Sequence, residues 1–309
     1  MDGHAGTQLP KVRQERLPSS PRITVVVVTR NEGAQLRRTV DNLDATLNSN
    51  SNIVVVDDGS MDGSADYLPR RRGRVRLLRG NSLGVTRARN LGARATRGDV
   101  LVFADAHLEL PSDWWRPLIE LLKRSEVGAV APVITDTAGT RFSGHGLTFR
   151  GPAMEVEWLK GSRTGEPVER PILPGCCLAM RRSVFLDAGG WDEGLLHRGN
   201  VDNELSIRLW LLGYKLLVTR DVAVGHLFRA RSPYRTGWPE YLHNRLRLAF
   251  VHLNAERLAR VVSALREEFF FGEAMLLIAQ GNSAARRQHL FGRRVRDDDW
   301  FFSRFDLKW

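Results

Sequence analysis

Cysteine is scarce in this 309-residue chain, and long apolar runs are missing. The two cysteines, Cys176 and Cys177, are adjacent, and adjacent cysteines rarely form a useful disulfide. We therefore expect a reducing compartment. No stretch offers the roughly 18 uncharged apolar residues that a membrane span needs. The sequence predicts a soluble, cytoplasmic protein that begins with a disordered tail over residues 1–20.

Acidic residues are fewer than basic ones, which gives the chain a formal net charge of +11. Such a balance suits an anionic partner, such as nucleic acid, a small anion, an acidic acceptor or a membrane surface. The arginines are dispersed along the whole chain, and aromatic residues do not interleave with them as in a platform that stacks single-stranded bases. Nucleic-acid binding is therefore not expected, while peripheral membrane contact stays open.

Strand and helix patterns alternate over the first 110 residues. Runs rich in β-branched residues predict buried strands at residues 22–30, 52–60, 74–80 and 99–107. Apolar residues at helical spacing predict helices at residues 31–47 and 81–96, and the polar segment from Met61 predicts the start of another. This alternation predicts an α/β fold with a mostly parallel, Rossmann-like sheet and helices on both faces.

The pattern changes in the second half of the chain. It weakens between residues 135 and 174 into short strands and loops, where an acceptor surface could vary. A strongly amphipathic helix and a strand are predicted over residues 200–219, and further helices follow Trp238. We therefore expect one α/β domain over residues 21–235 and a helical C-terminal extension over residues 236–309.

Three of the predicted strands end in polar side chains: Thr29 and Asn31, then Asp57 and Asp58, then Asp105 and His107. Ligand sites of such sheets gather beyond the carboxyl ends of the strands. Residues two apart in an extended chain face the same side, so the last pair could reach one cation or one polar ligand. Polar residues are ordinary at strand ends, but three such ends in one crevice favour a nucleotide or another polar ligand.

Several segments resemble the family two glycosyltransferases with the GT-A fold: "VVVV" before Asn31-Glu32, "VVVDDGSMDGS", "SLGVTRARNLGA", "DVLVFADAH" and "VDNELSIRLW". A closer resemblance is to the catalytic domain of the polypeptide N-acetylgalactosaminyltransferases. It rests on Asp105-Ala106-His107, "PGC" at 174–176, the segment 198–206, and "VGHLFR" followed by Pro233-Tyr234. The likeness runs from residue 23 to 234 in the same order, and it implies the GT-A glycosyltransferase fold.

The resemblance implies that Asp105, His107 and His226 bind a divalent metal ion, with Mn²⁺ expected. One carboxylate and two imidazoles suit such an ion, which stabilises the charge of a diphosphate leaving group. Asp57 is expected to accept a hydrogen bond from the uracil of a uridine nucleotide. The other residues expected to bind the nucleotide sugar are Thr29, Asn31, Asp58, Gly84, Arg89, Asp105 and Gly175. Structural alternatives exist, with Asp57 as a turn acid and His226 as a core histidine.

The segment 198–206 departs from the closer family, which has Trp and Glu where Arg198 and Val201 stand. In many inverting family two enzymes an Asp at this place is the general base, and Asp202 matches it. Glu204 is a secondary catalytic candidate. Both acids could instead complement the dipole of a helix N-terminus. Because retaining transferases need no such base, the stereochemistry stays open.

The sequence therefore predicts a metal-dependent glycosyltransferase that moves a sugar from a nucleotide diphosphate donor, with UDP expected, to an acceptor hydroxyl. The acceptor could be a peptide, a glycan, a lipid-linked sugar or a small molecule, since the anchor, stem and lectin domain common in the closer family are not visible. A non-catalytic relative that binds sugar nucleotides is one alternative. A nucleotidyltransferase is another, although "TRNEG" stands where those enzymes typically have a Gly-rich loop with a basic residue.

Overall fold

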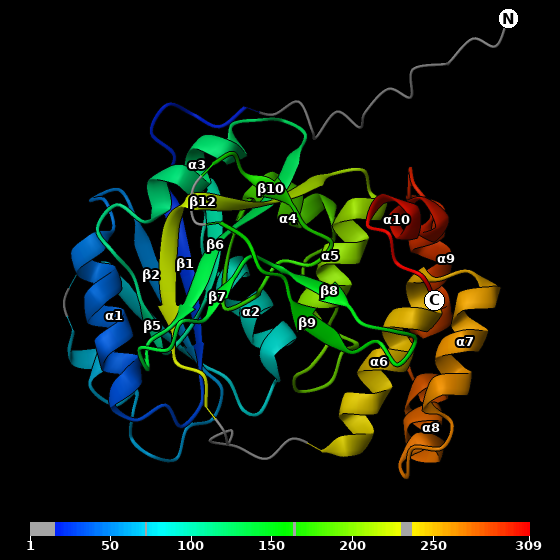
Figure 1. Ribbon diagram of the computed structural model, residues 1–309. Coiled ribbons are helices and arrows are strands. Elements are labelled where there is room, and N and C mark those ends of the chain that lie inside the picture. Colours follow the sequence, from blue (N-terminus) through cyan, green and yellow to red (C-terminus); the bar gives the residue numbers. More distant parts are fainter. Residues whose placement is uncertain (1–15, 72, 163–164, 230–236) are drawn as a thin grey trace, which may run out of the picture.

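The computed structural model describes residues 16–71, 73–162, 165–229 and 237–309, which form an α/β fold around a ten-stranded sheet (Figure 1). The main strand order is β10-β12-β6-β11-β4-β1-β2-β3. The tail predicted over residues 1–20 lies largely outside the described residues. The short strands are β5 (Leu108–Glu109), β7 (Ser143–Gly144) and β10 (Val168–Glu169) in this sheet, and β8 (Leu147–Phe149) and β9 (Val156–Trp158) in a two-stranded one.

Four parallel strands form the half of the sheet that the alternating pattern predicted. Their register aligns Val28 with Asp105 and Thr29 with Asp57, so the polar residues that follow these strands share one edge. The sequence explains this half, because β-branched side chains favour strands and a strand covered on both faces can be apolar throughout. The four strands are β1 (Ile23–Thr29), β2 (Asn52–Asp57), β3 (Val75–Arg79) and β4 (Val100–Asp105).

The other half of the sheet is mixed, so the prediction of a mostly parallel sheet holds only for the first four strands. β11 (Cys177–Arg181) lies between β4 and β6 (Val127–Asp136) and runs antiparallel to both. It can do so because the described part of the connection after β6 contains no crossover helix, the usual link between parallel strands. β12 (Lys215–His226) pairs in parallel with β6 and antiparallel with β5, opposite Leu108.

Helices cover both faces of the sheet, as the alternation predicted. Val25 and Val27 of β1 share an apolar cluster with α1 and α3, whereas Val26 shares the opposite cluster with α2 and α5. Alternate side chains of one strand therefore enter two different cores. The helices along the sheet are α1 (Ala34–Thr46), α2 (Val85–Arg94), α3 (Trp115–Leu122), α4 (Arg182–Asp187) and α5 (Val201–Leu211).

The prediction of a helix that begins at Met61 is wrong. Residues 61–67 form turns, and a single 3₁₀ turn follows at Leu68–Arg70. Gly63 has a φ of +71°, in the left-handed region that a right-handed helix does not use. Pro69 lacks the N–H that a continuing helix needs.

The helix α5 differs from the amphipathic helix that the sequence predicted, because every residue except Asp202 is buried. Its expected polar face is covered by the C-terminal helices α6 (Trp238–His252) and α10 (Asp298–Arg304). Trp210 of α5 packs against Trp300 of α10 with ring centroids 5.9 Å apart. The polar residues of α5 therefore need partners inside the protein.

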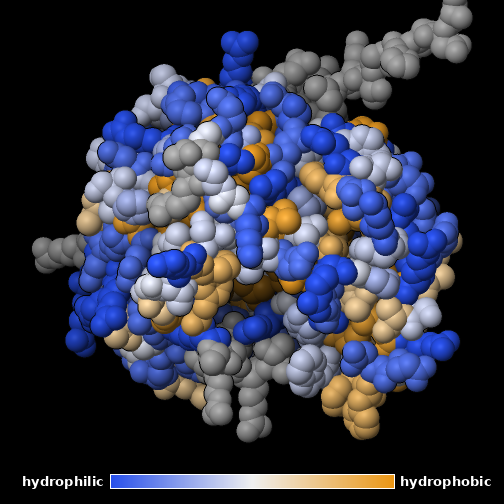
Figure 2. Space-filling view, in the orientation of Figure 1, coloured by the Kyte–Doolittle hydropathy of each residue, from blue (hydrophilic) through white to orange (hydrophobic). Residues whose placement is uncertain are grey.

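The helices predicted after Trp238 are confirmed, with α7 (Ala255–Leu265), α8 (Phe271–Gln280) and α9 (Ser283–Phe291) between α6 and α10. They gather at one side of the sheet (Figure 1), and α6, α7, α8 and α10 contribute residues to the apolar cluster of α2 and α5. The boundary predicted at 235/236 adjoins residues outside the described part. Hydrophilic side chains dominate the face in Figure 2, with an apolar patch over the α8 end. Among the described helices, none is long and apolar enough to cross a membrane.

A buried ion pair anchors α5. Arg208 donates to both carboxylate oxygens of Glu204, at 2.9 and 2.7 Å, and to backbone carbonyls in the segment 188–190. Both charged side chains are 1% exposed. Burial raises the pKa of Glu204, but the charges of Arg208 and Arg286 and a hydrogen bond with His252 outweigh it and hold that pKa well below its usual range.

We predict that Arg208→Met lowers the free energy of unfolding by about 3–5 kcal/mol, because the variant removes the donor to both oxygens of Glu204 and also to two buried backbone carbonyls. Urea unfolding followed by circular dichroism measures this loss. Arg260→Met is the control, because Arg260 also pairs with a glutamate four residues away, Glu256, but both side chains are largely exposed. The control should lose less than about 1 kcal/mol. Equal losses in the two variants would contradict the importance of the buried pair.

Candidate functional site

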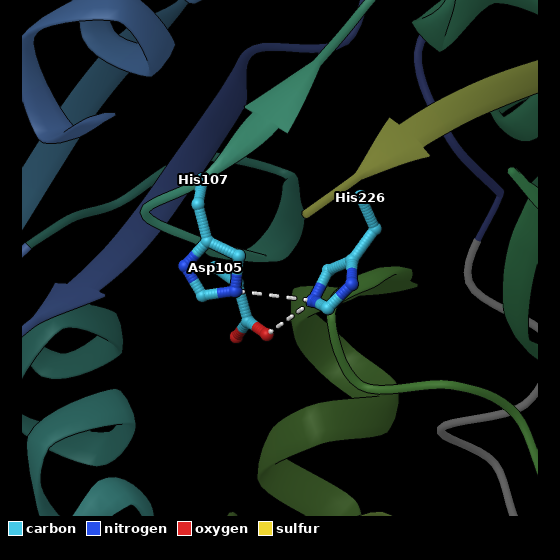
Figure 3. A group of neighbouring side chains, drawn as sticks. All are labelled: Asp105, His107 and His226. Atoms are coloured by element: carbon cyan, nitrogen blue, oxygen red, sulfur yellow. Dashed lines mark hydrogen bonds and ion pairs between the residues drawn. The ribbon is translucent and has the colours of Figure 1, made fainter. Parts of the chain in front are cut away.

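Asp105, His107 and His226 converge at the carboxyl edge of the sheet (Figure 3). Asp105 is the last residue of β4, His107 lies just before β5, and His226 ends β12. The antiparallel pairing of β12 with β5 brings the distant histidine to the other two residues. His226 Nε2 lies 3.2 Å from His107 Nε2 and 3.4 Å from Asp105 Oδ2. The two residues that the sequence placed on one strand face are thus joined by the third expected ligand.

The donor atoms of this cluster fit a first-row divalent cation. One ligand atom from each residue lies within 4.8 Å of the other two. Metal–nitrogen and metal–oxygen bonds of about 2.1 Å place neighbouring ligand atoms roughly 3 Å apart. The separations of His226 Nε2 from the other two ligand atoms, 3.2 and 3.4 Å, agree with this value. A mixed set of imidazole and carboxylate suits ions such as Mn²⁺.

Glu32 contacts His107 at the ring nitrogen that does not face the cluster. Its Oε2 lies 3.1 Å from His107 Nδ1 and also accepts a hydrogen bond from Arg229 at 2.6 Å. A carboxylate on Nδ1 fixes the ring orientation and leaves Nε2 to face the cluster. The sequence showed Glu32 only as a polar residue after the first strand, because its partner His107 stands 75 positions away.

The charges around the cluster shift its ionisation. Burial raises the pKa of Asp105, but a hydrogen bond with His226 and the charges of His107 and Arg89 outweigh it, so that pKa lies well below its usual range. Burial lowers the pKa of His107, but the hydrogen bond of Glu32 and the charge of Asp105 outweigh it and raise that pKa. Without a metal ion, Asp105 is therefore ionised and His107 holds a proton more strongly than a free histidine.

Arg89 of α2 links the cluster to α5. Its guanidinium donates to Asp202 Oδ1 at 3.0 Å and to the Gly175 carbonyl at 2.8 Å, and it lies 3.5 Å from Asp105 Oδ1. The Trp191 ring faces it at 4.5 Å. The resemblance assigned Arg89 to the nucleotide sugar, whereas its contacts in the structure are with two carboxylates and a carbonyl. Arg89 thereby holds Asp202 beside the cluster.

Only a residue without a side chain fits at position 175, because the Asp202 carboxylate fills the adjacent space. A Cβ atom on Gly175 would lie 1.9 Å from Asp202 Oδ1, so the space expected to admit the donor sugar is filled by this carboxylate. Burial raises the pKa of Asp202, the nearby charge of Arg89 lowers it, and the charge of Asp105 raises it further, with a net increase. A carboxylate with a raised pKa accepts a proton more readily.

A pocket of about 100 Å³ opens beside the cluster. Of the predicted nucleotide-sugar residues, those that line it are Thr29, Asp58, Gly84 and Asp105, and His107 adjoins them. Thr29 Oγ1 is buried without a hydrogen-bond partner among the described residues, so a polar group is left for a ligand or a water molecule. His197, which sequence reasoning missed, also lines the pocket, and its carbonyl accepts from Val85 N at 2.9 Å.

Asp57 and Asp58 hold loops together. Asp58 accepts from the backbone N–H groups of Leu83 and Gly84, at 2.6 and 2.9 Å. Asp57 is 1% exposed, accepts from Ser60 N and pairs with Arg79, and it does not line the pocket. The turn-acid alternative therefore describes the contacts of Asp57 in this structure better than a direct contact with uracil.

Asn31 and Glu204 are also not among the residues that line the pocket, and neither are Arg89, Gly175 and Asp202. Asn31 has a φ of +55°, and its Oδ1 accepts from Met61 N at 2.8 Å, so it joins the loop after β1 to the loop after β2. Glu204 is 1% exposed and points to Arg208 and His252. The burial of Glu204 against cationic partners indicates a structural role and not a catalytic one.

Aromatic rings stand next to the cluster on the side of β12. Phe228 lies 4.5 Å from His226 between ring centroids and 5.0 Å from Phe142, which contacts Trp158 at 5.3 Å. These rings come from the segment where the sequence pattern was weak and from the residues after β12. Pro233-Tyr234, quoted for the resemblance, lies outside the described residues.

Comparison with known families places this site in context. The model of the family "Glycosyl transferase family 2" matches residues 24–188, which is more than half of the chain. The chain therefore belongs to glycosyl transferase family 2. The matched segment contains the four parallel strands and two of the three cluster residues, whereas His226 and Asp202 lie beyond it.

Among curated proteins, the chain is similar to polypeptide N-acetylgalactosaminyltransferase 5 of Caenorhabditis elegans, with 32% identity over 76% of this chain and 42% of the relative. It is also similar to the human polypeptide N-acetylgalactosaminyltransferase 13, with 28% identity over 94% of this chain and 55% of the relative. The chain thus spans about half the length of these curated relatives.

Two solved structures share the fold. GalNAc-T7 with UDP, GalNAc and Mn²⁺ has a TM-score of 0.72 at 23% identity, covering 92% of this chain and 56% of that one. The mannosyltransferase PcManGT from Pyrobaculum calidifontis, in complex with GDP-Man and Mn²⁺, has a TM-score of 0.51 at 18% identity, covering 97% and 90%. The α/β fold with a helical C-terminal region that the sequence predicted is confirmed.

We predict that Gly175→Ala breaks the contact between Arg89 and Asp202, because the new methyl group occupies the position of the Asp202 carboxylate. A crystal structure of the variant measures the displacement, and unfolding measures a cost of about 1–3 kcal/mol. Gly151→Ala is the control, because no atom lies within 4 Å of its added Cβ. An Arg89–Asp202 distance still near 3.0 Å in Gly175→Ala would refute the prediction.

Proposed function

We propose that the protein is a metal-dependent glycosyltransferase that moves a sugar from a nucleotide diphosphate, UDP in the first instance, to an acceptor hydroxyl. The observation that carries this proposal is the convergence of Asp105, His107 and His226 beside a pocket at the carboxyl edge of the sheet. Membership of glycosyl transferase family 2 supports the reaction class. The fold neighbour with UDP, GalNAc and Mn²⁺ supports the choice of donor and ion to test first.

Asp105, His107 and His226 would hold Mn²⁺ or a similar ion. Bound there, the ion supplies positive charge that stabilises the diphosphate as the glycosidic bond breaks. Glu32 orients His107, and Arg89 keeps a guanidinium beside Asp105. These contacts fix the ligands in advance, so that little reorganisation is needed when charge develops.

Asp202 is the group that we propose takes a proton from the acceptor. Its side chain is 34% exposed, and Arg89 orients it 3.0 Å away. Its raised pKa favours proton acceptance. We therefore propose that Asp202 is the general base of an inverting transfer, in spite of Val201 at the position where the closer family has Glu.

The acceptor is proposed to be a hydroxyl on a peptide, since the curated relatives are polypeptide N-acetylgalactosaminyltransferases. The aromatic side chains of Phe142, Trp158 and Phe228 adjoin His226 and offer apolar contact to such a chain. A non-catalytic sugar-nucleotide-binding protein is the second candidate, favoured by Val201 alone, and the activity assay below distinguishes it.

We predict manganese-dependent hydrolysis or transfer with a UDP-sugar, abolished by a chelator. Asp105→Asn and His226→Ala should each lower turnover by at least about a hundredfold, because each removes a metal ligand. Titration calorimetry with Mn²⁺ should show weaker binding in the same variants. The matched controls are Asp113→Asn and His289→Ala, at exposed positions outside the pocket. Turnover that persists in chelator would refute the metal assignment, and metal-dependent donor binding without any turnover would favour the non-catalytic alternative.

We predict that Asp202→Asn lowers kcat by roughly 10²–10⁴, while the affinity for donor and metal is kept, because only proton acceptance is lost. Steady-state kinetics, together with NMR of the anomeric proton of the product, measures the rate and the stereochemistry. Near-normal turnover, or retention of configuration, would exclude Asp202 as the base.

A further inference from the structure

Arg286 of α9 bridges two buried carboxylates that belong to different segments. Its Nε lies 3.0 Å from Asp192 Oδ2, and its Nη2 lies 3.2 Å from Glu204 Oε1. The Arg286 side chain is 18% exposed, and the two carboxylates are at most 2% exposed. Burial lowers the pKa of Arg286, but the charges of Glu204 and Asp192 outweigh it and raise that pKa. A charged group of the C-terminal helices is therefore fixed inside the α/β domain.

One branch of this contact leads to Arg89. Asp192 directly follows Trp191, whose ring faces the Arg89 guanidinium at 4.5 Å. The Trp191 backbone exchanges two hydrogen bonds with the Asn90 side chain, at 2.9 and 3.0 Å. Fixing the position of Asp192 therefore also fixes the Trp191 ring that packs against the Arg89 guanidinium. Arg89 in turn donates to Asp202.

The second branch leads to Asp202 through the helix. Glu204 stands two residues after Asp202 in the first turn of α5. Arg208 and Arg286 both contact the Glu204 carboxylate, and His252 Nε2 lies 3.0 Å from it. Because a helical turn is rigid, fixing Glu204 fixes the backbone from which Asp202 projects.

We propose that Arg286 is a positioning residue for the Arg89–Asp202 pair, a role that rests on the proposed function. Both chains of contacts end at this pair. One ends at the Arg89 guanidinium, and the other ends at the helix backbone from which the Asp202 side chain projects. A planar guanidinium can reach two carboxylates at once, which a lysine ammonium does less well. Arg286 does not line the donor pocket, so its loss should change turnover and leave donor affinity unchanged.

The fold should survive removal of Arg286, because each carboxylate keeps another arginine. Arg247 donates to both oxygens of Asp192 at 2.8 and 2.9 Å. Arg208 donates to both oxygens of Glu204. No buried carboxylate is then left without a charged partner, which is the condition that makes such variants unfold.

The test compares Arg286→Met with Arg287→Met. Arg287 is the next residue of α9, and it donates to the backbone carbonyls of Phe250 and Leu253 and not to Asp192 or Glu204. We expect Arg286→Met to lower kcat on the order of tenfold, with a donor KM changed by less than about twofold. Arg287→Met should lose stability without loss of kcat. Arg286→Lys should restore kcat only in part, since it keeps the charge and loses the planar fork.

A crystal structure of Arg286→Met gives a readout that does not depend on activity, with Asp202 expected to be displaced from Arg89. An unchanged Arg89–Asp202 contact refutes the positioning role, whatever the activity. Equal kcat values in Arg286→Met and the wild type also refute it and leave the proposed function standing. A wild-type protein without metal-dependent turnover refutes the proposed function, and the displacement of Asp202 then decides the structural inference alone.

Discussion

The buried guanidinium of Arg89 holds together the two parts of the candidate site. It is 4% exposed and contacts Asp105 from the sheet, Asp202 from α5 and the carbonyl of Gly175. Two carboxylates that contact one guanidinium would repel each other without it, and the positive charge of Arg89 offsets that repulsion. Gly175 completes the arrangement, because a larger residue would fill the space of Asp202. The proposed metal ligands and the proposed base thus share one electrostatic support.

A second group of buried charges lies behind this support and extends into the C-terminal helices. Arg208, Arg247 and the partly exposed Arg286 pair with Glu204 and Asp192, whose carboxylates are almost fully buried. Such pairs add little net stability over apolar contacts, but they specify one arrangement because each charge needs its own partner. The helices after residue 237 are therefore joined to the α/β domain by specific ion pairs as well as by the shared apolar core.

Local sequence predicted the parts of the fold that depend on short-range pattern. The Val-rich strands, the helices between them and the polar strand ends all follow from the period of apolar residues. The antiparallel placement of β11 did not follow, because a long irregular connection sets no direction for the next strand. The helix expected at Met61 failed for the opposite reason, since Gly63 and Pro69 set a local geometry that the polar pattern did not reveal.

The sequence by itself determined the chemistry available to this protein: an Asp and a His two residues apart at the end of a buried strand, and acids at the start of a later helix. Only the tertiary structure decided which residues act together. His226 joins Asp105 through the pairing of β12 with β5, Glu32 reaches His107, and Asp57 and Glu204 pair with arginines away from the pocket. Strand pairing and burial are non-local, so the period of apolar residues could not join Asp105 to His226, 121 positions away. The resemblance implied that these two residues belong together, and the completed sheet gives the physical reason.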